Sequence, residues 1–196
     1  AGLAACGKIP FAASFAMFAA GRAFEQVRNS VGYPHLNVKI AGSHAGISVG
    51  EDGATHQCCE DIALMRTIPG MVVLNPADHY EMQAAVKAAA EYVGPVYIRL
   101  GRLAVESVNN NDDYTFEIGK GITLRDGKDI TIIATGLLVQ EAVKAAKALE
   151  AAGIDARVLD IHTIKPLDTE LVLKAAQETG RIVVAEEHNV IGGLGE

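Results

Sequence analysis

Short runs of apolar and β-branched residues alternate along this chain with stretches in which apolar side chains recur every three or four positions. A short apolar run bounded by turn residues is typical of a strand, and the longer spacing is typical of a helix with one buried face. In the first half of the chain we therefore expect four strands, at residues 9–14, 37–41, 71–74 and 96–100.

The clearest helix of the first half lies between the third and fourth expected strands. Asp78 precedes it as an N-cap, and Glu81 completes a pair of the capping-box type. Gly94 and Pro95 end it, because neither residue continues a helix well. The apolar face of this helix consists of Met82, Ala85, Val86 and Ala89.

A polar stretch, VESVNNNDDYTFE at residues 105–117, separates the first half from a second alternation of strands and helices. Its asparagines and aspartates favour turns over regular structure, so we place a domain boundary there. The order of elements predicts an α/β fold with two domains, residues 1–104 and 118–196, joined by the linker 105–117, each a mostly parallel sheet flanked by helices. In the second domain we expect strands at 122–124, 130–134, 156–161 and 182–185 and helices at 138–152 and 168–179.

Composition and charge narrow the class of protein. The 196 residues are 49% hydrophobic and 21% charged, which allows a buried core and excludes a fibrous or disordered chain. The net charge of -7, with scattered basic residues, disfavours nucleic acid and anionic membranes as partners. No apolar stretch reaches the roughly 18 residues that a membrane span needs. The cysteines, two of them adjacent at Cys58 and Cys59, suit neither disulfides nor a zinc knuckle, so we infer a reducing, cytoplasmic location.

The most informative segment is the loop at residues 41–57, which reads AGSHAGISVGEDGATHQ. It holds four glycines, two histidines and two adjacent acids, between a strand and a helix that we expect to begin near Cys58. Glycines let the backbone approach a ligand closely, and imidazole beside carboxylate offers proton transfer near neutral pH. Residue types alone nevertheless favour a turn-rich connection with solvated polar groups over a binding site.

The identity of the residues reverses that preference, because SHAGISVGEDGATHQ closely resembles the loop THDSIGVGEDGPTHQ of transketolases. These enzymes use thiamine diphosphate to move two-carbon ketol units between sugar phosphates. The resemblance covers nearly the whole chain and is most specific in GEDGATHQ, residues 50–57, with departures from the family at Ser43, Ala45 and Ala54. Further similar segments are IPFAASFAMFAAG at 9–21, RTIPGMVVLNPAD at 66–78, PVYIRLGR at 95–102 and KPLD at 165–168.

The resemblance implies the pyrimidine-binding domain of a transketolase followed by its C-terminal domain, and hence the C-terminal portion of such an enzyme. We expect a C-terminal subunit of the split type, or the equivalent fragment of a longer enzyme, truncated at both ends. By the same resemblance we expect the assembled enzyme to be a cytoplasmic transferase of the pentose phosphate pathway. It should act on sugar phosphates and self-associate as a dimer.

Several positions match residues that the family uses at its active site. Phe15 and Phe18 are implied to wall the pocket for the aminopyrimidine ring of the cofactor, with Phe18 as the stacking partner and Gly21 in place of a family tyrosine. Asp52 is implied to hold the 2-hydroxyl of the donor sugar, and His56 to contact substrate and cofactor as the second catalytic residue. Without the resemblance, the two phenylalanines would ordinarily be core residues.

His44 and Arg102 match the pair that grips the phosphate of the acceptor in the family. Such a pair would give an otherwise acidic protein a place for a dianion. Arg99 is interpreted only as a residue that caps a strand end, and the glycine-rich residues 192–195 as the opening of a further helix. The remaining histidines carry no motif of a site: His35, His79, His162 and His188.

Two parts of a thiamine enzyme are not found in this sequence. The activating glutamate of the family lies upstream of a stretch like residues 1–4, and no G-D-G segment is present to bind the diphosphate and its metal. We therefore expect thiamine diphosphate to be shared with an N-terminal diphosphate-binding subunit or domain, which holds Mg²⁺ or Ca²⁺. This chain is expected to supply no metal ligand and to be inactive alone.

Three other functions stay open. A deoxyxylulose-phosphate synthase and the beta subunit of a 2-oxoacid dehydrogenase share the architecture, although neither matches GEDGATHQ together with SHAG as well. A non-catalytic pairing or regulatory domain would keep the fold and lose the chemistry, but the retained Asp52, His56 and Arg102 argue against it.

Overall fold

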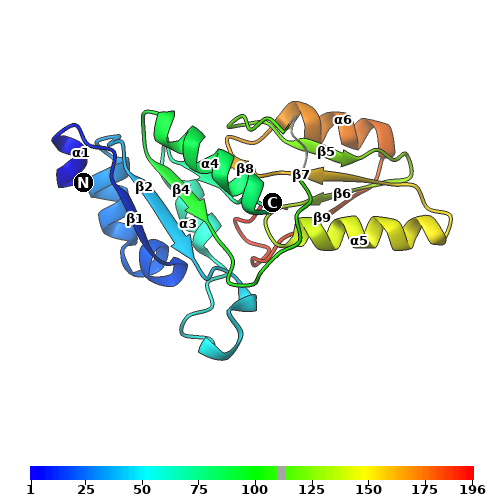
Figure 1. Cartoon of the computed structure of the whole chain (residues 1–196), viewed down its shortest axis with the longest axis horizontal. Helices are drawn as coiled ribbons and strands as arrows, with labels where there is room; N and C mark the ends of the chain where they lie inside the picture. Colours follow the sequence, from blue (N-terminus) through cyan, green and yellow to red (C-terminus); the bar gives the residue numbers. More distant parts are fainter. Residues whose placement is uncertain (110–113) are drawn as a thin grey trace.

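The computed structural model describes residues 1–109 and 114–196, and these residues form two sheets that lie side by side (Figure 1). The first sheet has the strand order β1-β2-β4-β3-β8, and the second has the order β5-β7-β6-β9. In chain order the strands are β1 Phe11–Phe15, β2 Lys39–Ser43, β3 Val72–Leu74, β4 Val96–Arg99, β5 Ile122–Arg125, β6 Ile130–Ala134, β7 Ala156–Asp160, β8 Thr163–Lys165 and β9 Ile182–Ala185.

Both sheets are mostly parallel, as the sequence predicts. In the described part of the chain, β1, β2, β4 and β3 run in one direction, and β8 runs opposite to its neighbour β3. In the second sheet β7, β6 and β9 are parallel, and β5 is antiparallel to β7. The carboxyl ends of β1, β2 and β4 therefore meet at one edge of the first sheet, where Phe15 pairs with Ser43.

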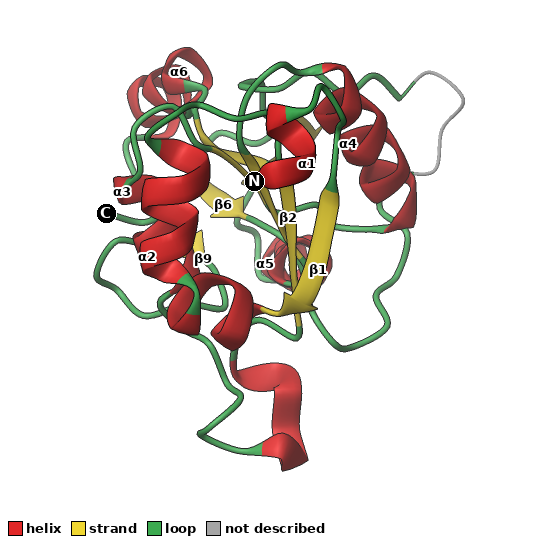
Figure 2. Ribbon diagram, turned by 90° about the vertical axis from the view of Figure 1, so that its left-hand side faces the viewer, coloured by secondary structure: helices red, strands yellow, loops and turns green. Residues whose placement is uncertain are grey.

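Helices cover both faces of each sheet. The helical segments are α1 Gly2–Ala5, the π-helical turns η1 Met17–Arg22 and η2 Val27–Gly32 on either side of α2 Phe24–Gln26, the 3₁₀ segment η3 Ile47–Asp52, α3 Asp61–Thr67, α4 His79–Glu91, α5 Leu138–Ala151 and α6 Thr169–Thr179. Figure 2 shows α2 and α3 on one side of the first sheet and α4 on the other, and Figure 1 shows α5 and α6 on opposite sides of the second. None of these described helices is long and apolar enough to cross a membrane.

The start of α4 follows its predicted cap. The Asp78 carboxylate accepts a hydrogen bond from the Glu81 amide at 3.0 Å, and the Glu81 carboxylate accepts one from the Ala77 amide at 2.6 Å. The capping pair is therefore confirmed, with the difference that Glu81 reaches the residue before the cap. Asp168 caps α6, and Gly180 ends it in the left-handed region with a φ of 64°.

Two features differ from the expectation. Residues 17–32 form helical turns, although no side chain caps their start at Ala16. Strand β8 joins the first sheet from the second half of the chain, and the Lys165 ammonium donates to the carbonyls of Arg66 and Ile68 at 2.7 and 2.6 Å. Residues 192–195 form turns, and the amides of Leu194 and Gly195 donate to the Glu186 carboxylate.

Candidate active site

Four of the predicted site residues come together at the carboxyl ends of β1 and β2. Phe15 ends β1, and His44 directly follows β2. Their rings stack with 4.0 Å between centroids and 10° between planes. His56 meets the ring of Phe18 edge-on at 5.2 Å and that of Phe15 at 5.9 Å. We call this group the ring cluster: Phe15, Phe18, His44 and His56.

The phenylalanines of the ring cluster are half-buried and do not belong to the main core. Their rings lie 6.1 Å apart and nearly parallel. The guanidinium carbon of Arg22 lies 4.6 Å from the centroid of the Phe18 ring, so a cation already packs on this aromatic surface. The small apolar group that adjoins the rings consists of Ala16, Ala45 and Cys58.

The loop between β2 and α3 is tied at its base and shaped by glycines. The Gly46 amide donates to the carbonyl of Cys58 at 2.8 Å, which closes the loop. Gly46, Gly50 and Gly53 have φ values of 86°, 72° and 73°, a region that costs energy for residues with a side chain. Segment η3 bends sharply at Gly50, and Asp52 ends it on the exposed side of the loop.

Each imidazole of the ring cluster has one nitrogen beside a neighbouring hydroxyl. Nδ1 of His44 lies 3.1 Å from Oγ of Ser43, and Nδ1 of His56 lies 2.9 Å from Oγ1 of Thr55. Neither Nε2 atom forms a hydrogen bond within residues 1–109 and 114–196. A ring nitrogen of this kind donates or accepts according to the tautomer, so both imidazoles can serve a ligand as well as the protein.

Arg102, which follows β4, forms an ion pair with the acidic part of the loop. Its Nη2 atom lies 2.6 Å from Oε1 of Glu51, and its Nη1 atom lies 3.2 Å from Oε2. The hydrogen bond from Arg102 lowers the pKa of Glu51. The same bond raises the pKa of Arg102, and the charge of the exposed Asp52 contributes to that rise.

The partner of Arg102 in this ion pair is Glu51 and not the predicted phosphate-site residue His44. Glu51 was not singled out from the sequence, and its place beside Asp52 in the motif is the signal that could have found it. The predicted phosphate pair does not touch in the described structure, because Arg102 contacts Glu51 while His44 stacks on Phe15.

Arg99 ends β4, but its side chain is buried in an ion pair instead of capping the strand. Its Nε atom donates to Oδ2 of Asp61 at 2.9 Å, and the Tyr97 hydroxyl donates to the same oxygen at 2.8 Å. Arg99 is 3% exposed, and the other two are fully buried. The interpretation of Arg99 as a simple strand-end residue was therefore wrong: the strand turns it inward, towards a carboxylate that needs a cation.

A separate cleft of about 310 Å³ adjoins the ring cluster at Phe18. It is lined by the exposed face of β1 and by the helical turns that follow, and not by His44, Asp52, His56 or Arg102. The candidate chemistry therefore lies outside this cleft. Within the described ranges, no group of three or more histidine, cysteine, aspartate or glutamate side chains is placed to hold a metal ion.

Sequence comparisons relate the whole chain to known proteins. The family profile described as "Transketolase, pyrimidine binding domain" matches residues 1–107, and "Transketolase, C-terminal domain" matches residues 119–196. The "Putative transketolase C-terminal section" of Methanocaldococcus jannaschii is 54% identical over 196 residues, which are 100% of this chain and 61% of the relative. A "6-deoxy-6-sulfo-D-fructose transketolase subunit" of Clostridium sp. (strain MSTE9) is 50% identical over 196 residues, 100% of this chain and 60% of the relative.

A solved structure gives the same picture in three dimensions. The protein described as "Split gene transketolase, inactive beta4 tetramer" has a TM-score of 0.91 and 55% identity to this chain. The match covers 98% of this chain and 62% of that one. The chain thus spans less than two thirds of the length of the relatives it matches.

Proposed function

The chain belongs to the transketolase family, and from this premise we propose that it is the C-terminal part of a split-type transketolase. In the assembled enzyme it takes part in the transfer of a two-carbon ketol unit from a ketose phosphate to an aldose phosphate. The observation that carries the proposal is the ring cluster at the carboxyl ends of β1 and β2, beside the loop that bears Asp52 and pairs with Arg102.

Residues 1–104 are proposed as the pyrimidine-binding domain and residues 118–196 as the C-terminal domain. The two profile matches, with a short unmatched stretch between them, support this division. The linker is residues 105–117, of which 110–113 lie outside the described residues.

The ring cluster fits the aminopyrimidine ring of thiamine diphosphate. Phe18 is half-buried and lies beside Phe15, and a planar heteroaromatic ring gains from stacking on such a surface. When bound, thiamine diphosphate supplies the nucleophilic carbon that carries the two-carbon unit. This chain is proposed to hold the pyrimidine end, while a partner subunit or domain holds the diphosphate together with Mg²⁺ or Ca²⁺.

His56 is proposed to move a proton at a hydroxyl of the donor sugar. Its Nδ1 atom lies beside Thr55, which leaves Nε2 for the substrate, and an imidazole can change protonation state near neutral pH. Asp52, an exposed carboxylate at the end of η3, is proposed to accept a hydrogen bond from the 2-hydroxyl of the donor. Together these contacts would fix the orientation of the bond that is cleaved.

His44 and Arg102 are proposed to bind the phosphate of the acceptor. The pair between Arg102 and Glu51 is exposed, and exposed ion pairs contribute little net energy. A phosphate dianion can therefore replace Glu51, since it accepts two hydrogen bonds from the same guanidinium. The relative named for 6-deoxy-6-sulfo-D-fructose supports a role for an anionic group at the end of the sugar.

We place the assembled enzyme in the cytoplasm and in the pentose phosphate pathway, as a dimer of catalytic units. The cysteines Cys6, Cys58 and Cys59 are free, which suits a reducing compartment. The solved relative described as an inactive tetramer supports both self-association and the expectation that this chain alone does not catalyse the reaction.

The test is ketol transfer by the full-length subunit mixed with its diphosphate-binding partner. We expect conversion of two pentose phosphates to a heptose and a triose phosphate, which requires both subunits and thiamine diphosphate. Consumption of pyruvate instead would favour a deoxyxylulose-phosphate synthase or a 2-oxoacid dehydrogenase. A complex that binds the cofactor without turning over either substrate class would favour a non-catalytic pairing domain and contradict the proposal.

A further inference from the structure

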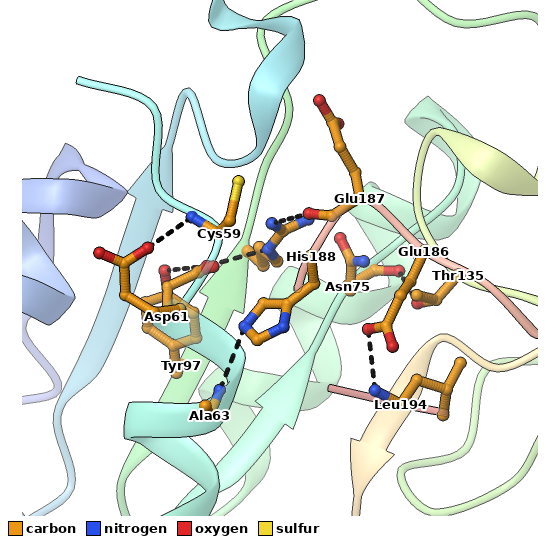
Figure 3. Close-up of polar contacts among 12 residues, drawn as sticks. Cys59, Asp61, Ala63, Asn75, Tyr97, Thr135, Glu186, Glu187, His188 and Leu194 are labelled. Carbon is orange, nitrogen blue, oxygen red and sulfur yellow. Dashed lines mark hydrogen bonds and ion pairs between the residues drawn. The ribbon is translucent and has the colours of Figure 1, made fainter. Parts of the chain in front are cut away.

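The residues that follow β9 reach from the second sheet to the loop of the candidate active site. Figure 3 shows the His188 ring directed at the Ala63 amide, whereas Glu186 turns towards Leu194 and the Glu187 side chain points away from Leu194. The Asn189 amide donates to the carbonyl of Cys59 at 3.1 Å, at the base of the loop. This segment, residues 186–189, therefore packs against the first half of the chain next to the base of the loop at Cys59.

Glu187 makes the contact that reaches furthest into the loop. One oxygen of its carboxylate accepts a hydrogen bond from the backbone amide of Ser48, in segment η3. The carboxyl group also fills the space beside Gly46, where a Cβ atom would collide with it. Although it is a charged residue, Glu187 is 8% exposed. Burying a carboxylate is costly, so the contact with the loop has to be well satisfied.

The backbone of Glu187 is itself fixed by the buried ion pair. Arg99 donates from Nη2 to the Glu187 carbonyl at 2.7 Å, while its Nε atom bonds to Asp61. Burial opposes the charged form of Arg99, but the carboxylate of Asp61 and, more weakly, that of Glu187 raise its pKa. Because its backbone carbonyl is held by Arg99, the Glu187 side chain can move little, and its carboxylate stays within reach of the Ser48 amide.

We propose that Glu187 is a positioning residue: it fixes the loop through Ser48 and thereby sets the places of Asp52 and His56. The inference rests on the proposed function for its catalytic consequence, but its structural part does not. Ser48 and Asp52 lie on either side of the bend at Gly50 in the short segment η3, and the loop returns through His56 to the base at Cys58. Holding Ser48 thus limits the free part of the loop to the residues between Ser48 and Cys58.

A matched pair of variants isolates the hydrogen bond. Glu187→Gln keeps an oxygen acceptor for the Ser48 amide, whereas Glu187→Met keeps the length of the side chain and loses the acceptor. Hydrogen exchange of the purified chain reports on the loop without any need for activity. We expect Glu187→Met to speed exchange over residues 46–52 about tenfold relative to Glu187→Gln, in line with the loss of one backbone hydrogen bond.

Glu186→Met is the control, because the Glu186 carboxylate bonds to the amides of Leu194 and Gly195, away from the loop. It should speed exchange over residues 192–196 and leave residues 46–52 unchanged. Equal exchange over 46–52 in Glu187→Met and Glu187→Gln would overturn the proposal. So would an equal effect of Glu186→Met there, which would mean general loosening.

The catalytic consequence is measured in the assembled enzyme. We expect Glu187→Met to lower kcat about tenfold, because a small misplacement of catalytic groups strongly lowers the rate. Glu187→Gln should keep kcat within about twofold of the wild type. Equal kcat values for the two variants, despite different exchange, would refute the effect on Asp52 and His56. If the wild-type complex shows no ketol transfer, the proposed function fails, and the exchange result still decides whether Glu187 holds the loop.

Discussion

At the scale of single residues, His56 separates a catalytic from a merely structural interpretation of the ring cluster. In the assembled enzyme we expect His56→Ala to lower kcat about 100-fold, because loss of a general acid or base has effects of that size. The substitution removes an imidazole that packs edge-on against Phe18, so some loss of cofactor affinity is expected as well. Steady-state kinetics with saturating thiamine diphosphate measures the effect on kcat.

His79 supplies the matched control for His56. It is exposed at the start of α4, where its ring packs on Tyr80 and its Nδ1 lies 3.3 Å from Oγ of Ser107. His79→Ala should leave kcat within about twofold, which is the usual outcome for a surface substitution remote from the reacting groups. Similar losses in the two variants would count against the assignment of His56.

Arg102 tests the phosphate site. Arg102→Ala should raise the KM for phosphorylated acceptors about 10- to 100-fold, because a charge-assisted contact to a dianion is lost. Unphosphorylated acceptors should keep their KM, since they never made that contact. The measurement is a comparison of the two acceptor classes at a fixed donor concentration, and an equal change in both classes would reject the role.

Glu51→Gln probes the same site from the other side. It removes the negative charge that pairs with Arg102 while keeping the size of the side chain. Because phosphate no longer competes with a carboxylate, the KM for phosphorylated acceptors should fall or stay level, opposite to Arg102→Ala. A rise in that KM would show that Glu51 helps to hold Arg102 in its binding position.

Residue identity alone located much of the candidate site, and the reason is that its parts are close in sequence. The motif from His44 to His56 lies in one loop, and Phe15 and Phe18 are three residues apart. Glu187 was missed because its contact with Ser48 spans 139 positions. No local pattern signals a carboxylate that is used so far away.

At the scale of secondary structure, elements with their own local signals were predicted within a residue or two. Asp78 and Gly180 mark a helix start and a helix end by side-chain and backbone chemistry that the sequence displays. Strand β8 was missed, because its three residues acquire strand geometry only by pairing with β3. The turns at residues 17–32 were missed because Ala16, at their start, makes no capping bond.

At the scale of the whole molecule, buried acids join the two halves. Glu81 on α4 accepts a hydrogen bond from the Tyr114 hydroxyl at 2.6 Å, and Asn109 donates to Asp160 at the end of β7 at 3.4 Å. Burial raises the pKa of Glu81 to about 7. Burial, and then the charge of Glu81, raise the pKa of Asp160 well above its ordinary value. The folded junction therefore holds protons that the unfolded chain releases.

Because the folded and unfolded chains bind different numbers of protons, the free energy of unfolding depends on pH. The unfolded carboxyl of Glu81 titrates near 4.5 and the folded one near 7, so its contribution is complete below pH 4.5 and is lost as the pH rises through 7. His162 acts in the opposite sense, because burial lowers its pKa to about 4 and stability falls as the pH drops below 6.5. The raised pKa of Asp160 acts in the same sense as that of Glu81, so the wild-type profile mixes a slope from this pair of acids with an opposing slope from His162.

Comparison with Glu81→Gln isolates the slope of the pair of acids, since His162 is the same in both proteins and the substitution also removes the charge that helps to raise the pKa of Asp160. The amide side chain of this variant can still accept from the Ala77 amide and donate to the oxygen of Tyr114, so the fold should survive. Urea unfolding between pH 4.5 and 8 should show the wild type losing about 3 kcal/mol relative to the variant as the pH rises. Parallel profiles would mean that Glu81 releases its proton at the same pH in the folded and unfolded chain, and that the junction does not depend on a protonated acid.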